Sequence, residues 1–412
     1  MSGQADFAEK LDKLARLAVN VGLGSVSGQE VVMTAPLDAV ALVRRITHHA
    51  YAAGATLVTV LYNDDQAALD RFQTASEASF DQAPGWLYEG MAAAFKSGAA
   101  RLAIVGEDPS LLSAQDPAKV ARANRARSIA YRPALDLIAR AAINWTIVAA
   151  ATPAWAKTVF PDLAEDQAVD ALWAAIFKAS RADGADPVAD WAAHNATLRA
   201  RCDLMNAKRY SALHFRGPGT DLRVGLADGH IWSGGSSRAE NGILYNANIP
   251  TEEIYTTPHR VRVDGTVSAT KPLSYQGTLI TDISVRFASG AIVEAHASSG
   301  ADVLRRILET DEGARRLGEV ALVPHHSPIS ESGLLFYNTL FDENASCHIA
   351  LGQAYAKTVA GTDLMDGPAL LAAGINQSLI HIDWMIGSGD IDIDGIGAGG
   401  AADPVMRKGA WA

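Results

Sequence analysis

Cysteine is scarce in this chain of 412 residues, which has only Cys202 and Cys347 and no CxxC spacing. This scarcity argues against both a disulfide framework and a thiolate zinc site. Basic residues are also in deficit, because 35 Lys and Arg stand against 46 Asp and Glu, giving a net charge of −11. Nucleic acids and anionic membranes attract basic proteins, so neither is an expected partner.

Long apolar runs are missing as well. The longest one, residues 141–156, is interrupted by Asn144 and Pro153, so no membrane span is expected. The N-terminus is polar and charged and has no secretory apolar region. The composition, with 49% apolar residues, suits a globular protein of two or three domains, and we expect it to be cytoplasmic.

Two parts of the chain have different patterns. Up to about residue 205, short apolar segments such as residues 56–62 and 101–105 end in polar turns and alternate with helical patterns. This alternation predicts an N-terminal α/β domain, residues 1–205, with a largely parallel sheet. Glycine, threonine and β-branched residues become frequent afterwards, and they predict an α+β, strand-rich C-terminal domain, residues 206–412. Strands are expected there at residues 220–226, 260–263, 277–280 and 284–287.

Eight of the eleven histidines lie in the second part, where His381 and Asp383 form the most informative pair. Residues 378–386 read as a strand, so these two side chains share one face. A buried carboxylate beside an imidazole is costly unless it is compensated, and a divalent cation is one compensation. A hydrogen-bonded His–Asp couple in a core is the other reading. The opposite face is wholly apolar and is expected to pack on the core: Ile380, Ile382, Trp384 and Ile386.

Three other segments of the second part supply residues of the types that bind metals. Glu252 and Glu253 follow a proline turn, and Glu319 is the only charge in a predicted strand at residues 317–323. His348 leads into residues 349–355, which are small and apolar enough for a buried helix. Carboxylates and imidazoles without thiolates suit zinc, cobalt, manganese or magnesium.

Tyr355 is a candidate for the same site. If residues 349–355 are helical, Tyr355 lies two turns from His348 and on the same side, so its phenol could reach back toward the imidazole. A core tyrosine whose hydroxyl is capped by a neighbour fits the spacing equally well. Cys347 points about 100° away from His348 on a helix, and we expect it to be a small core residue.

These segments together resemble the thermophilic aminopeptidase family of dinuclear metallopeptidases, which includes the aminopeptidase T, aminopeptidase S and PepS types. No residue at an expected metal-ligand position departs from the family pattern. Each match is unspecific alone, but their common order is specific, and they extend nearly from end to end. The matching segments are residues 106–109, 153–156, 219–222, 248–253, 312–314, 317–322, 340–345, 347–352 and 381–383.

The resemblance implies a metal-dependent aminopeptidase that removes N-terminal residues from peptides by means of water activated by two divalent metal ions. It also implies a homodimer that encloses a cavity. Glu319 is the favoured bridging ligand, with Glu253 second, and Glu252 is a candidate general base or anchor for the substrate ammonium. The implied metal ligands are Glu253, Glu319, His348, His381 and Asp383, with Tyr355 as a further ligand or a catalytic phenol.

Two other functions remain open. The same ligand types could serve a dinuclear hydrolase of another class, such as an amidase or a phosphoesterase. A metal- or peptide-binding protein without catalysis is the second alternative. It is disfavoured because every position of the ligand pattern is filled.

Overall fold

The computed structural model describes residues 2–275, 278–362 and 365–412. The chain forms two compact units: Met1–Ala193 with Ser236–Pro250, and His194–Gly235 with Thr251–Ala412. The chain first passes from unit 1 to unit 2 within helix α8 (Pro187–Lys208). Residue 205, the expected domain boundary, lies in the same helix.

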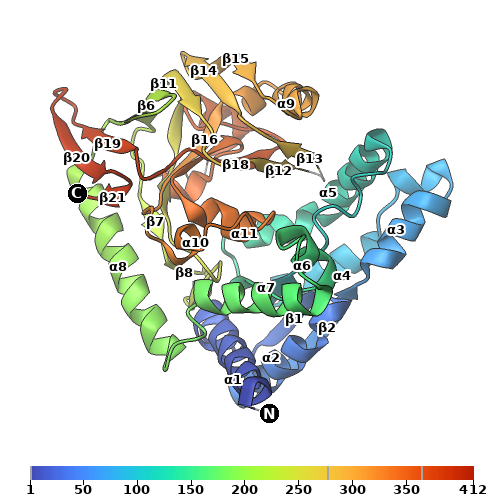
Figure 1. Ribbon diagram of the computed structural model, residues 1–412. Helices are drawn as coiled ribbons and strands as arrows, with labels where there is room; N and C mark the ends of the chain where they lie inside the picture. The colour runs from blue at the N-terminus through green and yellow to red at the C-terminus, as the bar shows by residue number, and fades with distance from the viewer. Residues whose placement is uncertain (1, 276–277, 363–364) are drawn as a thin grey trace. The chain divides into compact units, whose positions relative to one another are not determined.

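Unit 1 is built on a four-stranded parallel sheet in the order β2-β1-β3-β4 (Figure 1). The predicted α/β domain with a parallel sheet is thereby confirmed. Its strands are β1 (Glu30–Pro36), β2 (Leu57–Asn63), β3 (Ala100–Val105) and β4 (Trp145–Ala149), with a hairpin of β8 (Ser236–Arg238) and β9 (Leu244–Asn246). Its helices are α1 (Ser2–Leu17), η1 (Ala18–Leu23), η2 (Leu37–Ala39), α2 (Val40–Ala52), α3 (Asp65–Thr74), η3 (Glu77–Asp81), α4 (Gly85–Lys96), α5 (Pro117–Ala139), α6 (Pro153–Val159) and α7 (Glu165–Ala179).

Strand β1 is apolar because side chains of other elements cover both of its faces. Val32 packs in one cluster with Phe95 of α4 and Leu137 of α5. Val31 and Met33 point to the other face and are fully buried there, and α2 also contacts β1. A parallel strand that is covered on both faces reads as a continuous apolar run, which explains the pattern in the sequence.

Unit 2 contains two antiparallel sheets (Figure 1). The eight-stranded sheet has the order β15-β14-β11-β6-β5-β19-β20-β21, and the five-stranded sheet has the order β18-β17-β16-β10-β7. Their strands are β5 (Ala212–Gly217), β6 (Thr220–Leu226), β7 (Ser233–Gly234), β10 (Ile254–Thr256), β11 (Pro258–Ser268), β14 (Ser284–Ala288), β15 (Ala291–His296), β16 (Leu317–Leu322), β17 (His348–Gly352), β18 (His381–Met385), β19 (Asp392–Ile396), β20 (Ala402–Arg407) and β21 (Ala410–Trp411).

A hairpin and several short helices complete this unit. The hairpin comprises β12 (Leu273–Tyr275) and β13 (Thr278–Ile280), and Gly277, where the predicted strand begins, lies outside the described residues. The helices, besides α8, are α9 (Ala301–Leu308), η4 (Gly313–Arg315), α10 (Pro328–Glu331), α11 (Thr339–Asp342), η5 (Glu343–Ala345), η6 (Ala356–Thr358) and α12 (Gly367–Ala372). The expectation of a strand-rich C-terminal part is confirmed.

One hydrophobic core joins the two sheets of unit 2. Val224 and Val263 of the eight-stranded sheet belong to the same buried cluster as Val320, Ile349 and Trp384 of the five-stranded sheet. These three residues of the five-stranded sheet lie on β16, β17 and β18. Because strand side chains alternate, the residues next to them point to the opposite face, away from this core.

The predicted helix over residues 349–355 was wrong. Residues 349–352 instead belong to β17, all five residues of that strand are buried, and residues 353–355 follow it. A strand that is buried on both faces has no polar alternation, so its sequence cannot be distinguished from that of a buried helix. Cys347 is buried near Val323 and Met406, as expected for a core residue.

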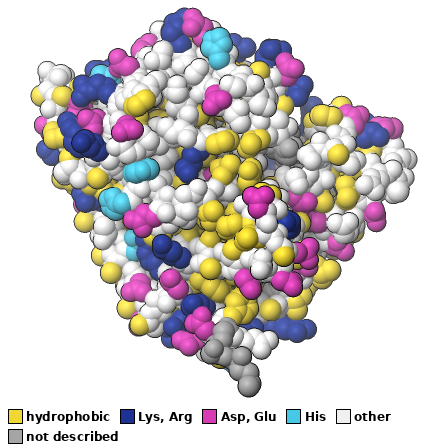
Figure 2. All heavy atoms as spheres, viewed as in Figure 1, with side chains coloured by type: hydrophobic (Ala, Val, Ile, Leu, Met, Phe, Trp, Pro, Cys, Tyr) yellow, Lys and Arg dark blue, Asp and Glu magenta, His cyan; other side chains and the backbone are white. Residues whose placement is uncertain are grey.

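Charged side chains of both signs occur on the surface of the molecule. Figure 2 shows acidic side chains interspersed with basic ones across the face in view. Among the described residues, no helix combines the length and the apolar character that crossing a bilayer requires.

Candidate metal centre

The register of the five-stranded sheet brings the predicted ligands to one face. Ala350 of β17 pairs with Glu319 of β16 on one side and with Asp383 of β18 on the other. His348 lies two residues before Ala350, and His381 lies two residues before Asp383, so all four ligand side chains share this face. The small side chain of Ala350 leaves space between the two carboxylates.

Glu253 reaches the same face from the neighbouring strand. Tyr255 of β10 pairs with Ala321, which in turn pairs with His348. Glu253 lies two residues before Tyr255, just ahead of the strand. It is 3.0 Å from His348, measured from Oε2 to Nε2.

Glu319 lies between two histidine–carboxylate pairs. Its Oε1 is 3.7 Å from Nε2 of His348, and its Oε2 is 3.8 Å from Nε2 of His381. His381 is also 3.5 Å from Oδ1 of Asp383. One ligand atom each from Glu253, Glu319 and His348 lies within 4.8 Å of the other two. The spacing is that of donors around a cation.

Backbone carbonyls orient both imidazoles. Nδ1 of His348 is 3.2 Å from the carbonyl oxygen of Ser346, and Nδ1 of His381 is 2.7 Å from that of Gln353. When Nδ1 of a neutral imidazole donates to a carbonyl, Nε2 keeps its lone pair for a metal, and in both residues Nε2 faces carboxylates. This is the arrangement in which proteins present histidine to a metal ion.

Two buried atoms at the centre are left without a hydrogen bond. Among the described residues, Oε2 of Glu253 and Nε2 of His348 have no hydrogen-bond partner, although they lie 3.0 Å apart. Burying such atoms unpaired is unfavourable by about 1–3 kcal/mol each. A divalent cation between them would satisfy both atoms, so the residues fit a metal.

The electrostatics of the cluster favour added positive charge. Burial alone would lower the pKa of His348, but Glu253 and Glu319 raise it well above its ordinary value. The pKa of His381 rises to about 10 because Asp383 and Glu319 outweigh the effect of burial. Burial, together with Glu253 and Asp383, raises the pKa of Glu319. Burial opposes ionisation of Asp383 as well, but the adjoining His381 and His348 lower its pKa.

Tyr355 lies at the site, but it is not on a helix that contains His348, as was considered from the sequence. It follows β17 and precedes η6, and its ring centroid lies 4.8 Å from that of His381 and 6.1 Å from that of Tyr255. Loss of hydration and the charges of Glu319 and Asp383 raise its pKa well above the ordinary value, which keeps the phenol protonated. The residue is 37% exposed, so it lies at the open side of the cluster.

Glu252 lies beside the cluster but outside its ion pairs. Its Oε2 is 3.7 Å from Nε2 of His194, which is 2.8 Å from the carbonyl oxygen of Thr251. The backbone N–H of Glu252 donates to Oδ1 of Asn344 at 2.7 Å. Glu252 is therefore anchored next to Glu253 with a different set of neighbours.

Glu343 is an acidic residue near the cluster that the sequence did not single out. Burial, followed by the charges of Asp383 and Glu253, raises its pKa well above the ordinary value. The adjacent Asp342 instead accepts the backbone N–H groups of a loop, at Phe336 and Asn338. In the sequence both residues belong to one polar segment. Nothing in that segment indicates that Asp342 accepts hydrogen bonds from a loop while Glu343 is the candidate ligand.

Residues 7–411 match the thermophilic metalloprotease (M29) family. The chain belongs to this family. Aminopeptidase T of Thermus thermophilus is 53% identical over 98% of this chain and 99% of its own length, and aminopeptidase AmpS of Bacillus subtilis is 44% identical over 98% and 99%. The solved structure of wild-type AmpT from Thermus thermophilus has a TM-score of 0.94 and 52% identity, covering 98% of this chain and all of that one.

Membership of the M29 family confirms the resemblance inferred from the sequence. The likeness to AmpT extends over both units, so the family fold includes the α/β part as well as the strand-rich part that carries the cluster. A metalloprotease family implies a divalent metal, and the cluster of Glu253, Glu319 and His348 is the group of ligand atoms that the described residues offer for it.

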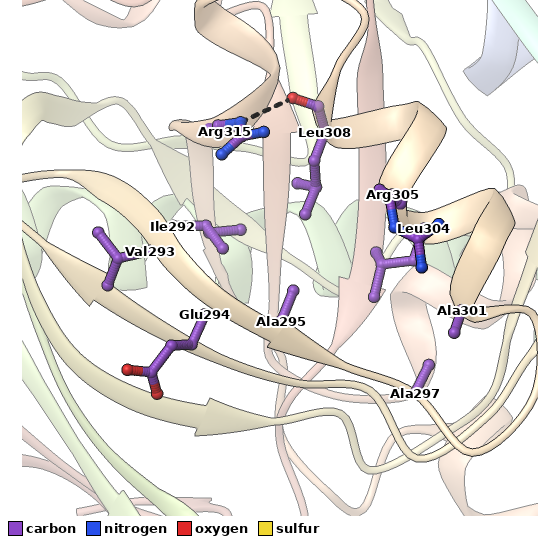
Figure 3. Close-up of a pocket in the computed structure, with 10 residues that line it drawn as sticks. All are labelled: Ile292, Val293, Glu294, Ala295, Ala297, Ala301, Leu304, Arg305, Leu308 and Arg315. Carbon is purple, nitrogen blue, oxygen red and sulfur yellow. Dashed lines mark hydrogen bonds between the residues drawn. The ribbon is translucent and has the colours of Figure 1, made fainter.

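Two cavities in unit 2 differ in their relation to this cluster. A pocket of about 200 Å³ lies between β15 and α9. Arg315 donates to the carbonyl of Leu308 there at 3.1 Å, and Figure 3 marks this hydrogen bond. Among the described residues that line it, Glu294 is the only carboxylate, and it pairs with Arg286, so these residues offer no metal site. A cavity of about 20 Å³ adjoins the cluster and is lined in part by Asp383 and Glu343.

Proposed function

We propose that this protein is a metal-dependent aminopeptidase whose centre holds two divalent ions. Aminopeptidase activity follows from membership of the M29 family and from relatives that are named aminopeptidases. The proposal of two ions is supported by Glu319, whose two oxygens face different imidazoles at 3.7 and 3.8 Å. A carboxylate in that position can serve as the ligand shared by two metals.

The proximity of the side chains divides the proposed ligands into two groups. Glu253 and His348 would hold one ion, His381 and Asp383 would hold the other, and Glu319 would bridge them. Glu343 is a further candidate ligand because it lines the same small cavity as Asp383. Zinc, cobalt, manganese and magnesium all accept such oxygen and nitrogen donors.

Bound divalent ions supply the Lewis acidity that polarises a carbonyl and activates water. The protein orients the ligands through the backbone carbonyls that hold both imidazoles. Tyr355, protonated and partly exposed, would donate a hydrogen bond to the oxyanion that develops on the scissile carbonyl. Glu252 would act as a general base or anchor the substrate ammonium.

The substrates in this proposal are peptides with a free N-terminus. Homodimeric assembly and a cytoplasmic location belong to the same proposal, because they were expected from the resemblance and the composition. Light scattering of the purified protein measures the assembly. A mass of twice 43.4 kDa is the expected result.

Elemental analysis coupled to activity tests the function. We expect up to two equivalents of divalent metal per chain, hydrolysis of aminoacyl-p-nitroanilides and dipeptides after loading with cobalt or zinc, and no hydrolysis of a phosphomonoester. Amide hydrolysis that ignores a free N-terminus would favour the amidase alternative. Failure on the whole panel with every metal would favour a non-catalytic binding protein.

Glu319→Gln is the decisive variant. It keeps the size of the side chain but removes the charge that both imidazoles face, so hydrolysis should be abolished while the circular dichroism spectrum is unchanged. Glu309→Gln, at an exposed position of the same unit, is the matched control and should keep full activity. A metal-loaded Glu319→Gln variant with full activity would overturn the scheme.

A further inference from the structure

Lys357 places a positive charge at the open side of the metal centre. Its Nζ lies 5.9 Å from the ring centroid of Tyr355, within the range of a cation–π contact. Burial lowers the pKa of Lys357, but the charges of Glu319 and Glu253 oppose this shift by favouring its ammonium form. In the part of the chain that the structure describes, no carboxylate lies within ion-pair distance of it.

The charge balance of a metal-loaded site would leave this ammonium without a counterion. When ionised on binding two divalent ions, Glu253, Glu319, Asp383 and Glu343 would carry four negative charges and offset the four positive charges of those ions. The positive charge of Lys357 then remains in excess beside Tyr355. An anionic group of the substrate is the natural partner for such a charge.

The position of Lys357 determines which group of a bound substrate it can contact. Tyr355 is the proposed partner of the scissile carbonyl, and one residue of extended chain spans at most about 3.6 Å. The carboxylate of a dipeptide lies one residue beyond the scissile carbonyl, so an ammonium next to Tyr355 is at a suitable distance for it. A long flexible lysine side chain can adjust to close this contact.

We propose that Lys357 binds the C-terminal carboxylate of short peptides and so makes dipeptides preferred substrates. This inference rests on the proposed aminopeptidase function. The developing oxyanion is the other negative group within reach. Binding of the C-terminal carboxylate affects only substrates that carry it, whereas an oxyanion contact affects all of them alike.

The test compares three substrates that share the same N-terminal residue: an aminoacylglycine, its C-terminal amide and the aminoacyl-p-nitroanilide. The metal-loaded Lys357→Met variant should raise KM for the aminoacylglycine about tenfold, equivalent to about 1.4 kcal/mol, and leave both neutral substrates within twofold of the wild type. Lys357→Arg, which keeps the charge, should restore the preference in large part. Lys408→Met, at an exposed lysine of the same unit, is the matched control and should change nothing.

The outcomes separate the inference from the function on which it rests. One outcome is that the wild type cleaves the amide and the aminoacylglycine with equal KM, and that Lys357→Met has the same KM values as the wild type. That result would overturn the role of Lys357 and leave the aminopeptidase function intact. An equal loss of kcat on all three substrates would assign Lys357 to the oxyanion instead and overturn carboxylate binding. A wild type that cleaves none of the three would overturn both proposals.

Discussion

At the scale of single residues, the hydrogen bond on one side of each histidine determines what its other side can do. Ser346 and Gln353 occupy Nδ1 of His348 and His381 through backbone carbonyls, which substitution of side chains cannot remove. Nε2 of each histidine is therefore committed to the carboxylate face. A centre built in this way keeps its donor geometry even when one carboxylate is changed, so substitutions there should act on the metal before they act on the fold.

Tyr355→Phe tests the phenol. If its hydroxyl contacts only the developing oxyanion, removing it should lower kcat about 100- to 1,000-fold and leave KM within a few-fold, because the ground state loses nothing. Steady-state kinetics of metal-loaded protein measure both constants, with metal content as the control. An unchanged kcat would reduce Tyr355 to a packing partner of His381.

The adjacent glutamates form a matched pair of variants. Glu253→Gln removes an anionic ligand that lies 3.0 Å from His348, so bound metal should fall in elemental analysis. Glu252→Gln should keep the metal but lower kcat by about 100-fold or more if the carboxylate is the general base. If Glu252 anchors the substrate ammonium instead, KM rises. Unchanged kcat and KM would leave Glu252 as only a neighbour of His194.

At the scale of elements, the two faces of the five-stranded sheet have different roles: one packs in the core and the other carries the candidate ligands. Ile382 and Trp384 of β18 pack in the core, as the sequence predicted, while His381 and Asp383 alternate with them toward the site. This strand could be predicted because its polar alternation survives in the sequence. On β17, Ala350 lies on the site face, so only His348 marks that face in an otherwise apolar strand, and the prediction failed there.

The sequence was informative about the site for a related reason. Glu319 and His348 stood out because each is the only charged or titratable residue in an apolar strand, and a lone polar residue there must face something. Their mutual distances could not be predicted, because they depend on the register of strands that are far apart in the chain. Glu343 was missed because it lies in a polar turn where charge is ordinary.

Two neighbouring residues on β17 test the division between faces. Ala350 pairs with both Glu319 and Asp383, so Ala350→Val should crowd the ligands and weaken metal binding about 10- to 100-fold. Ile349 points into the core, and Ile349→Val should lower the free energy of unfolding by about 0.5–1.5 kcal/mol and leave metal affinity unchanged. Metal titration and urea unfolding measure the two quantities. Equal metal affinities for the two variants would refute the assigned faces.

At the scale of the whole molecule, the two units differ in their chemistry. Both cysteines and the entire candidate metal centre lie in unit 2. Burial raises the pKa of Cys202 to about 12 and that of Cys347 to about 11, so neither thiol forms a reactive thiolate near neutral pH. Thiol labelling therefore reports the opening of unit 2 and is not affected by fluctuations confined to unit 1.

Metal binding should suppress this opening. A ligand that binds only the native state stabilises it by about 2.7 kcal/mol at a hundred times its Kd, which corresponds to a hundredfold smaller open population. At neutral pH, labelling of both cysteines should therefore slow about 100-fold when cobalt or zinc is added to that excess, and EDTA should restore the faster rate. Glu319→Gln protein should show little response to metal. Because the labelled thiols and the bound metal are in the same unit, equal rates with and without metal in the wild type would mean that the centre does not stabilise the sheet that carries it.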